Sequence, residues 1–312
     1  MAFKEVNTLA SQGIPFLFIS DFKAKQVEVI PLDELHKHDI EYSICENYCY
    51  EEHEHFLQKQ AIDFSDYSKK FDAVIEKIKA GETYILNLTQ ATSIETDLSL
   101  KAIYNVANAH YKLRYKDEFV CFSPEKFIQI KENMIHTFPM KGTIDASVEF
   151  AEEKILANEK EMAEHVMIVD LLRNDLSMVA NSVRVEKFRY IQKIDAGDKE
   201  LLQVSSHISG VLSENWRERL GDILKALLPA GSISGAPKRS TLDIIENVEK
   251  YERKFFSGVF GIFDGQNFDS GVMIRFIENS EDGFLYKSGG GITLDSDALL
   301  EYAELQDKIY LP

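Results

Sequence analysis

The chain has 312 residues, of which 45% are hydrophobic and 11% aromatic, as in an ordinary soluble globular protein with a large core. Its formal net charge of −17 argues against binding to nucleic acid or to an anionic membrane surface. The N-terminus has no apolar signal core, and the longest apolar runs are too short to cross a bilayer, so we expect a cytoplasmic protein. Three cysteines do not make a disulfide framework.

The first 65 residues predict a short region of strands and turns that packs on the rest, with a hairpin formed by residues 16–19 and 27–30. Helices are expected over residues 67–80, 98–113 and 152–172, from near Pro237, and from residue 296. Strands are expected over residues 84–89, 118–122, 126–130, 183–188, 201–212, 258–263, 272–277 and 284–287. Because no regular βαβ rhythm is present, the pattern favours an α+β fold with mainly antiparallel sheets. We expect residues 66–312 to form one catalytic domain.

Two of the expected helices carry pairs of glutamates. Glu161 and Glu164 are three residues apart, as are Glu301 and Glu304, so each pair shares one helix face. A solvated charged face would explain either pair alone. However, residues 166–172 are mostly apolar, so the first helix is expected to be largely buried. Buried carboxylates need a metal or a paired base, and Mg2+ commonly takes one or two of them.

Three further features could hold an anion, which a protein of this charge needs for an anionic substrate. Arg275 interrupts an apolar strand and could clamp a carboxylate, although a structural salt bridge is the alternative. The glycines 289–291 allow backbone N–H groups to approach an anion, although such a run often marks a turn. Residues 229–238 form a glycine-rich entry into a helix but lack the spacing of a nucleotide-binding loop.

Lys141 lies in the run Thr137-Phe-Pro-Met-Lys-Gly-Thr143. Burial and nearby positive charge lower the pKa of an amine and free its lone pair, so a lysine in such a pocket can act as a nucleophile. The alternative is a structural ion pair with Glu125 or Asp145.

Five motifs in a fixed order resemble the chorismate-utilising enzymes, and the resemblance runs from about Asp66 to the C-terminus. The motifs are Thr137-Phe-Pro-Met-Lys-Gly-Thr143, Glu161-Met-Ala-Glu164-His-Val-Met-Ile-Val-Asp170, Pro229-Ala-Gly-Ser-Ile-Ser-Gly-Ala-Pro-Lys238, Gly289-Gly-Gly291 and Glu301-Tyr-Ala-Glu304. That family includes anthranilate synthase, isochorismate and salicylate synthases, and aminodeoxychorismate synthase component I. The lysine before Gly-Thr is typical of the last branch, since the others usually carry alanine there.

The resemblance implies a large two-sheet β sandwich with helices packed outside. It also implies Mg2+ bound by Glu164 and Glu304, with Glu161 and Glu301 helping through water. One carboxylate of chorismate would be held by Arg275, Gly290 and Gly291, and the other by Lys308. Gly142, Thr143, Gln203 and Gly235 would complete the substrate pocket. Lys141 would add to the ring at C2, and Glu125 would protonate the departing 4-hydroxyl as general acid.

Three positions depart from the family pattern: Ile85 replaces a glutamine, Gln203 a histidine and Phe256 a tyrosine. Isochorismate and salicylate synthases use a lysine at the first position to activate water, so Ile85 argues against hydroxylation. The expected reaction is amination of chorismate at C4 with ammonia from a separate glutaminase subunit, on the route to 4-aminobenzoate and folate. We expect no fused glutaminase or lyase. The alternatives are the reaction of anthranilate synthase component I, or a catalytically silent subunit that scaffolds a glutaminase.

Overall fold

Two large antiparallel sheets organise the chain, one in each of two compact units. The computed structural model describes residues 1–45, 55–195 and 200–311. Unit 1 consists of Met1–Leu32, Lys126–Ser232 and Val259–Gly271, and unit 2 consists of Asp33–Glu125, Ile233–Gly258 and Val272–Pro312. The two sheets with their helices confirm the expected α+β class. The domain boundary expected near residue 65 stays a prediction.

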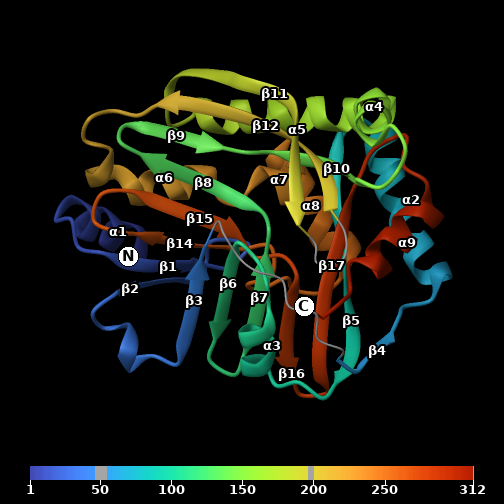
Figure 1. Cartoon of the computed structure of the whole chain (residues 1–312), viewed down its shortest axis with the longest axis horizontal. Coiled ribbons are helices and arrows are strands. Elements are labelled where there is room, and N and C mark those ends of the chain that lie inside the picture. Colours follow the sequence, from blue (N-terminus) through green and yellow to red (C-terminus); the bar gives the residue numbers. More distant parts are fainter. Residues whose placement is uncertain (46–54, 196–199, 312) are drawn as a thin grey trace. The chain divides into compact units, whose positions relative to one another are not determined.

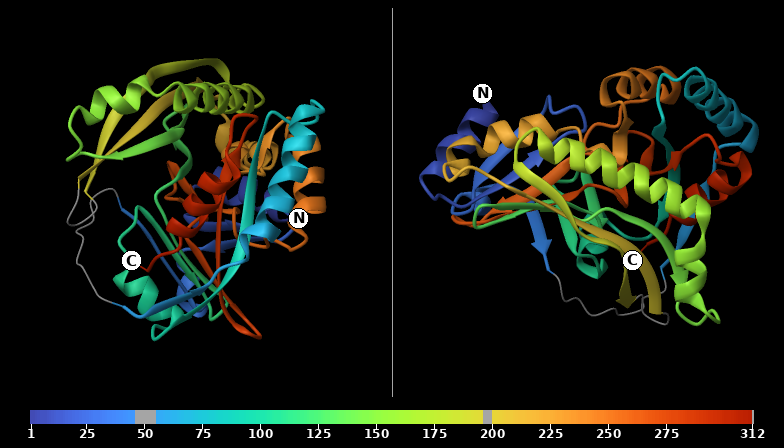
Figure 2. Two further views of the ribbon diagram at one scale, coloured as in Figure 1. Left: turned by 90° about the vertical axis from the view of Figure 1, so that its right-hand side faces the viewer. Right: turned by 90° about the horizontal axis from the view of Figure 1, so that it is seen from above.

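Nine strands form the sheet of unit 1, in the order β10-β12-β9-β8-β15-β14-β1-β2 with β11 paired to β12 (Figure 1). They are β1 Phe16–Ser20, β2 Val27–Pro31, β8 Lys126–Lys131, β9 Met134–Thr137, β10 Met140–Asp145, β11 Asn181–Asp195, β12 Glu200–Val211, β14 Val259–Phe263 and β15 Phe268–Val272. The helices are α1 Ala2–Ser11, α4 Ala151–Ala157, α5 Glu159–Ser177, η2 Trp216–Arg219, α6 Leu220–Leu227 and, at the boundary with unit 2, α7 Gly231–Ser234. Helices α4 and α5 pack on β10 and β12 (Figure 2), which places the Glu161 pair beside the strand of Lys141.

Eight strands form the sheet of unit 2, in the order β13-β5-β17-β16-β7-β6-β3 with β4 paired to β5. They are β3 Ile40–Ile44, β4 Leu57–Gln60, β5 Ile85–Thr96, β6 Tyr111–Tyr115, β7 Phe119–Ser123, β13 Gly235–Ala236, β16 Phe276–Ser280 and β17 Gly283–Ile292. The helices are η1 Leu35–Lys37, α2 Phe64–Lys79, α3 Leu100–Val106, α8 Lys238–Glu249 and α9 Ala298–Asp307. Helix α9 packs on α2 and β17, so the Glu301 pair lies beside the glycine strand.

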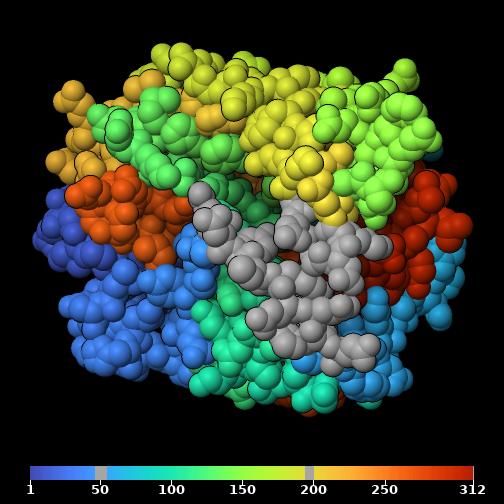
Figure 3. Space-filling model, viewed as in Figure 1, coloured from blue at the N-terminus to red at the C-terminus, as the bar shows by residue number. Residues whose placement is uncertain are grey.

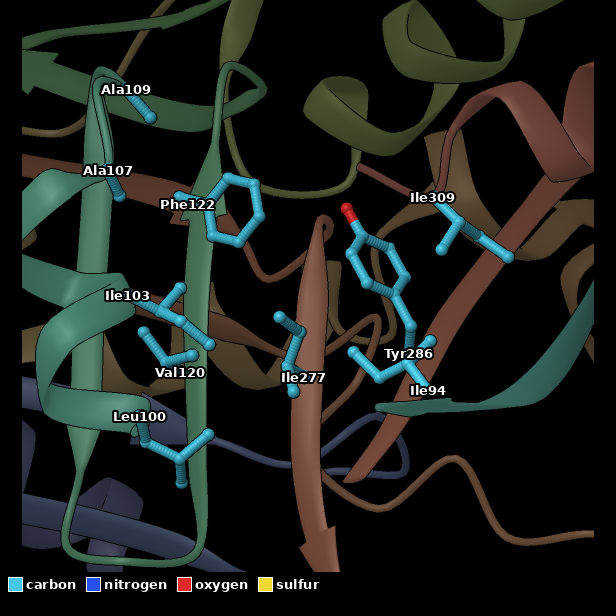
Figure 4. Packing of buried hydrophobic residues seen from close by; sticks show 10 residues of the cluster. All are labelled: Ile94, Leu100, Ile103, Ala107, Ala109, Val120, Phe122, Ile277, Tyr286 and Ile309. Carbon is cyan, nitrogen blue, oxygen red and sulfur yellow. The ribbon is translucent and has the colours of Figure 1, made fainter. Parts of the chain in front are cut away.

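A hydrophobic cluster in unit 2 anchors the end of the chain (Figure 4). Its buried members are Ile94, Leu100, Ile103, Ala107, Ala109, Val120, Phe122, Ile277, Tyr286 and Ile309. Ile309 follows Lys308, the residue that caps the C-terminus of α9, so its burial fixes the end of the helix that carries Glu301 and Glu304.

Several expected elements are confirmed, and others are wrong in a way the packing explains. The hairpin is present as β1 and β2. The helix expected over residues 67–80 is α2, which ends at Lys79 and has Ala80 as its C-cap. The helix expected over residues 98–113 ends at Val106, because residues 111–115 pair with β3 and β7 instead. The helix expected over 152–172 is two helices, since Asn158 interrupts it and caps α5. Helix α1 was not expected in the N-terminal region.

The surface of unit 1 includes much of α4 (light green in Figure 3), whose polar residues Glu152, Glu153 and Lys154 are exposed. Of the cysteines, Cys45 is exposed and Cys121 is buried, while Cys49 lies outside the described residues. Within the described parts of the chain, every helix is too short or too polar to cross a membrane.

Candidate active site

The residues selected from the sequence fall into two groups, one in each unit. The β10–α5 group in unit 1 contains Lys141, Gly142, Thr143, Glu161, Glu164 and Gln203. The residues in unit 2 are Glu125, Gly235, Arg275, Gly290, Gly291, Glu301, Glu304 and Lys308. Of these, Gly290, Gly291, Glu301, Glu304 and Lys308 form the β17–α9 group, on the glycine strand and the last helix.

In the β10–α5 group, Lys141 makes an ion pair with Glu164. The lysine Nζ lies 2.6 Å from Glu164 Oε2, and the two side chains are 26% and 3% exposed. A second lysine, Lys160, is 3.9 Å from the other carboxylate oxygen and is more exposed. The sequence suggests Glu125 or Asp145 as a structural partner of Lys141. In the structure, the lysine pairs with Glu164 of α5. The buried carboxylate is therefore paired with a base, one of the two outcomes that burial requires.

Gly142 has a backbone that other residues adopt only with strain. Its φ is +89°, and the pairing of β10 with β12 shifts register between Met140 and Thr143. A Cβ atom at Gly142 would lie 3.3 Å from Glu161 Oε2. The glycine thus permits the local bend and leaves room beside the first glutamate of the pair.

Thr143 and Gln203 are brought together by the sheet. They are direct partners across the antiparallel pair β10 and β12. The resemblance had assigned both to the substrate pocket from separate motifs, and the register places them as neighbours. A glutamine at this position offers both a donor and an acceptor, so it retains hydrogen-bonding capacity at a position where the family resemblance implies a histidine.

The β17–α9 group is built in a similar way. Glu301 is buried and accepts a hydrogen bond from Ser296 Oγ at 2.9 Å. A Cβ atom at Gly290 would lie 3.2 Å from Glu301 Oε2 and 3.8 Å from Lys308 Nζ. Lys308 pairs with Glu304 at 2.7 Å and donates a hydrogen bond to the Gly289 carbonyl at 2.8 Å. Lys308 thus links the last helix to the glycine strand.

Both groups therefore share one plan. A strand glycine leaves space beside the first glutamate of a Glu-x-x-Glu helix, and a lysine pairs with the second glutamate. Within residues 1–45, 55–195 and 200–311, no three His, Cys, Asp or Glu side chains gather as a ready-made metal centre. Mg2+ often takes only one or two carboxylates and completes its shell with water and substrate oxygens. The hard carboxylate oxygens of each group fit that ion.

Arg275 is not on a strand, contrary to the expectation for residues 272–277. Strand β15 ends at Val272 and β16 begins at Phe276, and these two strands belong to different sheets. Arg275 lies in the connection with a φ of +51°, a strained value for a residue other than glycine. Its Nε donates to the Tyr310 hydroxyl at 3.3 Å. Burial opposes the charge, but the tyrosines Tyr310 and Tyr286 and then Glu125 outweigh it, so the pKa of Arg275 is raised.

Glu125 lies in another of the connections between the sheets, after β7 and before β8. Its backbone carbonyl accepts a hydrogen bond from the Val272 amide at 3.0 Å, so the two connections are tied together. The two predicted site residues at chain crossings, Glu125 and Arg275, consequently come from adjacent segments of unit 2.

Gly235 and Ile85 belong to paired strands of unit 2. Gly235 has a φ of +130°, and a Cβ there would lie 2.0 Å from the Ile85 carbonyl oxygen, so no other residue fits. The Ile85 side chain is buried and lies 3.6 Å from the Cβ position of Gly291. The isoleucine thus places an apolar group beside the glycine strand, where the family resemblance implies a glutamine. Phe256, which replaces the family tyrosine, is also buried.

A buried ion pair, Glu249 with Arg253, supports this strand and was not identified from the sequence. Arg253 donates to the backbone carbonyls of Asn87 and Ile233 at 2.6 and 3.0 Å. Glu249 accepts from both the backbone amide and the hydroxyl of Thr89 at 2.8 Å. On the opposite side of β5, Asn87 and Thr89 pair with Gly291 and Gly289. The available signal was the Glu-x-x-x-Arg spacing at the end of a helix, which is common and weak.

Comparison with known proteins identifies the class. Residues 24–311 match the family model of chorismate binding enzymes, so the chain belongs to that family. It is 46% identical over 313 residues to a protein of Haemophilus influenzae described as an uncharacterized PabA-like protein, covering 99% of this chain and 95% of that protein. A PabA-like protein of Pasteurella multocida is 44% identical over 315 residues, covering 99% and 97%.

More distant relatives carry names of two activities. Aminodeoxychorismate synthase component 1 of Bacillus subtilis is 34% identical over 260 residues, and anthranilate synthase component 1 of Mycobacterium tuberculosis is 31% identical over 264 residues. The matches cover 77% and 78% of this chain but only 54% and 50% of those proteins. Among solved structures, the menaquinone-specific isochorismate synthase MenF of Escherichia coli has a TM-score of 0.72 at 16% identity, covering 98% of this chain and 79% of that one, which supports the fold.

Proposed function

We propose that this chorismate-binding enzyme is an aminodeoxychorismate synthase component I. It would aminate chorismate at C4 to give 4-amino-4-deoxychorismate, with ammonia from a separate glutaminase subunit, in the cytoplasmic route to 4-aminobenzoate and folate. The observation that carries the proposal is the placement of Lys141. It sits beside a bent glycine on β10, partly exposed, with its ammonium held by the buried Glu164. The relationship to the Bacillus subtilis enzyme supports the same activity.

In the proposed reaction, the Lys141 amine forms a bond to C2 while both ring double bonds shift, from C1=C2 and C5=C6 to C1=C6 and C4=C5, and the 4-hydroxyl leaves as water. Glu125 supplies the proton that the leaving hydroxyl needs. Ammonia then attacks C4, both double bonds shift back, and the C2–N bond to Lys141 breaks. The lysine is thereby restored, with loss of one proton from the incoming ammonia. Covalent catalysis of this kind divides one difficult substitution into two easier ones.

Mg2+ would be held by Glu164 and Glu304, with Glu161 and Glu301 beside them. When bound, the ion would offset the charge of a substrate carboxylate. The chain's own residues would do the remaining binding. Arg275 and the amides near Gly290 and Gly291 would orient one carboxylate, and Lys308 would meet the other. Thr143, Gln203 and Gly235 would shape the rest of the pocket.

Two other functions are separable from this one. The activity of anthranilate synthase component I is supported by the 31% identity to the Mycobacterium tuberculosis protein. Because the identity to the Bacillus subtilis aminodeoxychorismate synthase is a similar 34%, Lys141, and not overall identity, distinguishes the two activities. A silent scaffold subunit is favoured by the changes at Ile85, Gln203 and Phe256.

A single experiment distinguishes these functions. The purified protein is incubated with chorismate, Mg2+ and ammonium at alkaline pH, where free ammonia replaces the glutaminase supply. Products are identified by chromatography with mass spectrometry and by conversion with a lyase that forms 4-aminobenzoate. We expect a product that this lyase converts. Anthranilate would instead support the second function, and chorismate binding without turnover would support the scaffold.

A further inference from the structure

His165 follows Glu164 on α5 and is completely buried. Its Nε2 lies 2.7 Å from the hydroxyl of Ser206 on β12. This hydrogen bond forms with either tautomer, because a hydroxyl can donate or accept. Burial and then the charge of Arg189 lower the pKa of His165 to about 4, whereas contact with the Lys141 backbone acts in the opposite direction. The imidazole is therefore neutral near pH 7, and its ring reaches the strand that carries the lysine.

Ser206 connects three elements around this histidine. Its hydroxyl bonds to His165 on α5 and accepts the backbone N–H of Arg189 on β11 at 2.9 Å. Its own backbone N–H donates to the carbonyl of Pro139 at 2.9 Å, immediately before β10. One buried serine thus ties the acidic helix and the strand β11 to the start of the lysine strand.

Arg189 extends the connection to α4. It is buried, with a φ of +47°, and its guanidinium donates to the carbonyls of Ile155 and Leu156 at 3.1 and 2.8 Å. These carbonyls belong to the last turn of α4, where a positive charge is favourable. The segment between α4 and α5 is thereby held, and with it the N-terminal turn of the helix that presents Glu161 and Glu164.

We propose that His165 and Ser206 are positioning residues, which set the distance between Lys141 on β10 and Glu164 on α5. The Lys141–Glu164 ion pair joins β10 to α5, and the hydrogen bonds from His165 through Ser206 to Pro139 join the next residue of the same helix to the residue just before β10. A shift of α5 would change the lysine's counter-ion and the placement of both glutamates together. The consequence for turnover rests on the proposed function, but the geometric part does not.

The test uses graded variants of the two residues. His165→Gln can place a nitrogen near the position of Nε2 and keep the bond to Ser206, whereas His165→Leu and Ser206→Ala cannot. The matched control is Ser209→Ala. Ser209 is equally buried on β12, its hydroxyl donates a hydrogen bond to Glu186 on β11, and its strand partners lie on β9 and β11.

With ammonium as the nitrogen source, we expect kcat to fall about ten-fold to a hundred-fold in His165→Leu and Ser206→Ala, because small misplacements of catalytic groups have effects of this size. KM for chorismate should change much less, His165→Gln should restore most of kcat, and Ser209→Ala should match the wild type. Thermal melts identify variants that fail to fold. If His165→Leu does not fold, Ser206→Ala, the smaller change, decides the outcome.

A second readout does not depend on turnover. Side-chain NMR of labelled lysine, assigned with Lys141→Arg, reports the environment of the Lys141 ammonium. We expect its signal to shift in Ser206→Ala and to keep the wild-type position in His165→Gln and Ser209→Ala. An unchanged signal and unchanged kcat in folded Ser206→Ala would overturn the inference. A shifted signal in a protein that makes no aminated product would uphold the positioning role while rejecting the proposed function.

Discussion

Lys141 Nζ lies 2.6 Å from Glu164 Oε2, so the proposed nucleophile and a proposed metal ligand are partners of one ion pair. The carboxylate is buried and the lysine is partly exposed, which leaves the amine the more accessible of the two. A lysine that pairs with a buried acid could be purely structural, and variants of Lys141 and Lys160 separate that role from a chemical one.

Lys141→Ala should retain chorismate binding but lose most turnover. The side chain removed is the proposed nucleophile, whereas Arg275 and the β17–α9 group remain. Binding is measured by calorimetry, and turnover by product chromatography with ammonium. Intact wild-type protein quenched during turnover should also carry a mass adduct on the peptide that contains Lys141.

The matched control for that variant is Lys160→Ala. Lys160 also approaches Glu164, at 3.9 Å, but it is more exposed and belongs to α5 itself. Its removal should leave kcat near the wild-type value. Equal losses in both variants, with no adduct, would mean that Lys141 contributes only charge to the site.

Glu164→Gln and Glu304→Gln should both abolish Mg2+-dependent turnover but should differ in stability. Glu164 is 3% exposed and neutralises Lys141, so its loss should cost about 1–2 kcal/mol, less than for a fully buried pair because the lysine is partly exposed. Glu304 is 50% exposed, so Glu304→Gln should melt like the wild type. Activity is titrated with Mg2+, and Glu153→Gln on α4 serves as an exposed control. Wild-type Mg2+ dependence in either variant would contradict the metal assignment.

Gly142→Ala should reduce both stability and turnover. A side chain in the left-handed region costs about 1 kcal/mol, and the new Cβ would crowd Glu161 Oε2 from 3.3 Å. Gly81→Ala separates the two effects, because Gly81 has a φ of +75° with nothing within 4 Å of its Cβ position. Both variants should lower the melting temperature, but only Gly142→Ala should lower kcat. A normal kcat in Gly142→Ala would show that the space beside Glu161 is not used.

Stability should fall as the pH is lowered from about 6.5 toward about 4. The pKa of His165 is lowered from 6.5 to about 4, so the unfolded chain takes up a proton in this window before the folded protein does. The pKa values of His136 and His207 are also lowered, chiefly by burial, and act in the same direction. His165→Gln should therefore flatten, but not remove, the pH dependence of the melting temperature. Identical slopes in the variant and the wild type would contradict a neutral buried His165.

Local sequence patterns correctly predicted those helices and strands whose hydrophobic spacing and turn residues lie within a short stretch of chain. The hairpin of β1 and β2 and the helix α2 are of this kind. Helix α1 was missed because no side chain caps its start. The interruption at Asn158 was readable, since Asn158 caps α5 and an acidic residue, Glu161, follows three residues later.

The site was predictable as a set of residues but not as a set of contacts. Ordered motifs identified both glutamate pairs and the glycine strand. The partner of Lys141 could not be found this way, because it depends on how α5 packs against β10, which patterns within either element do not show. The prediction of a helix over residues 98–113 was wrong for a similar reason, because the pairing of β6 with β3 and β7 overrides the local preference of these residues for a helix.

The ion pair of Glu249 and Arg253 also has a consequence for association between chains. Opposite β17, strand β5 has strand partners only at residues 85–86, from β13, and at residues 93–96, from β4, among the described residues. Between them, Arg253 and Glu249 occupy the outward carbonyl of Asn87 and the outward amide of Thr89. An exposed stretch of edge would offer these groups to a strand of another molecule. The two side chains therefore close this edge to strand addition and protect the sheet from aggregation next to its glycine strand.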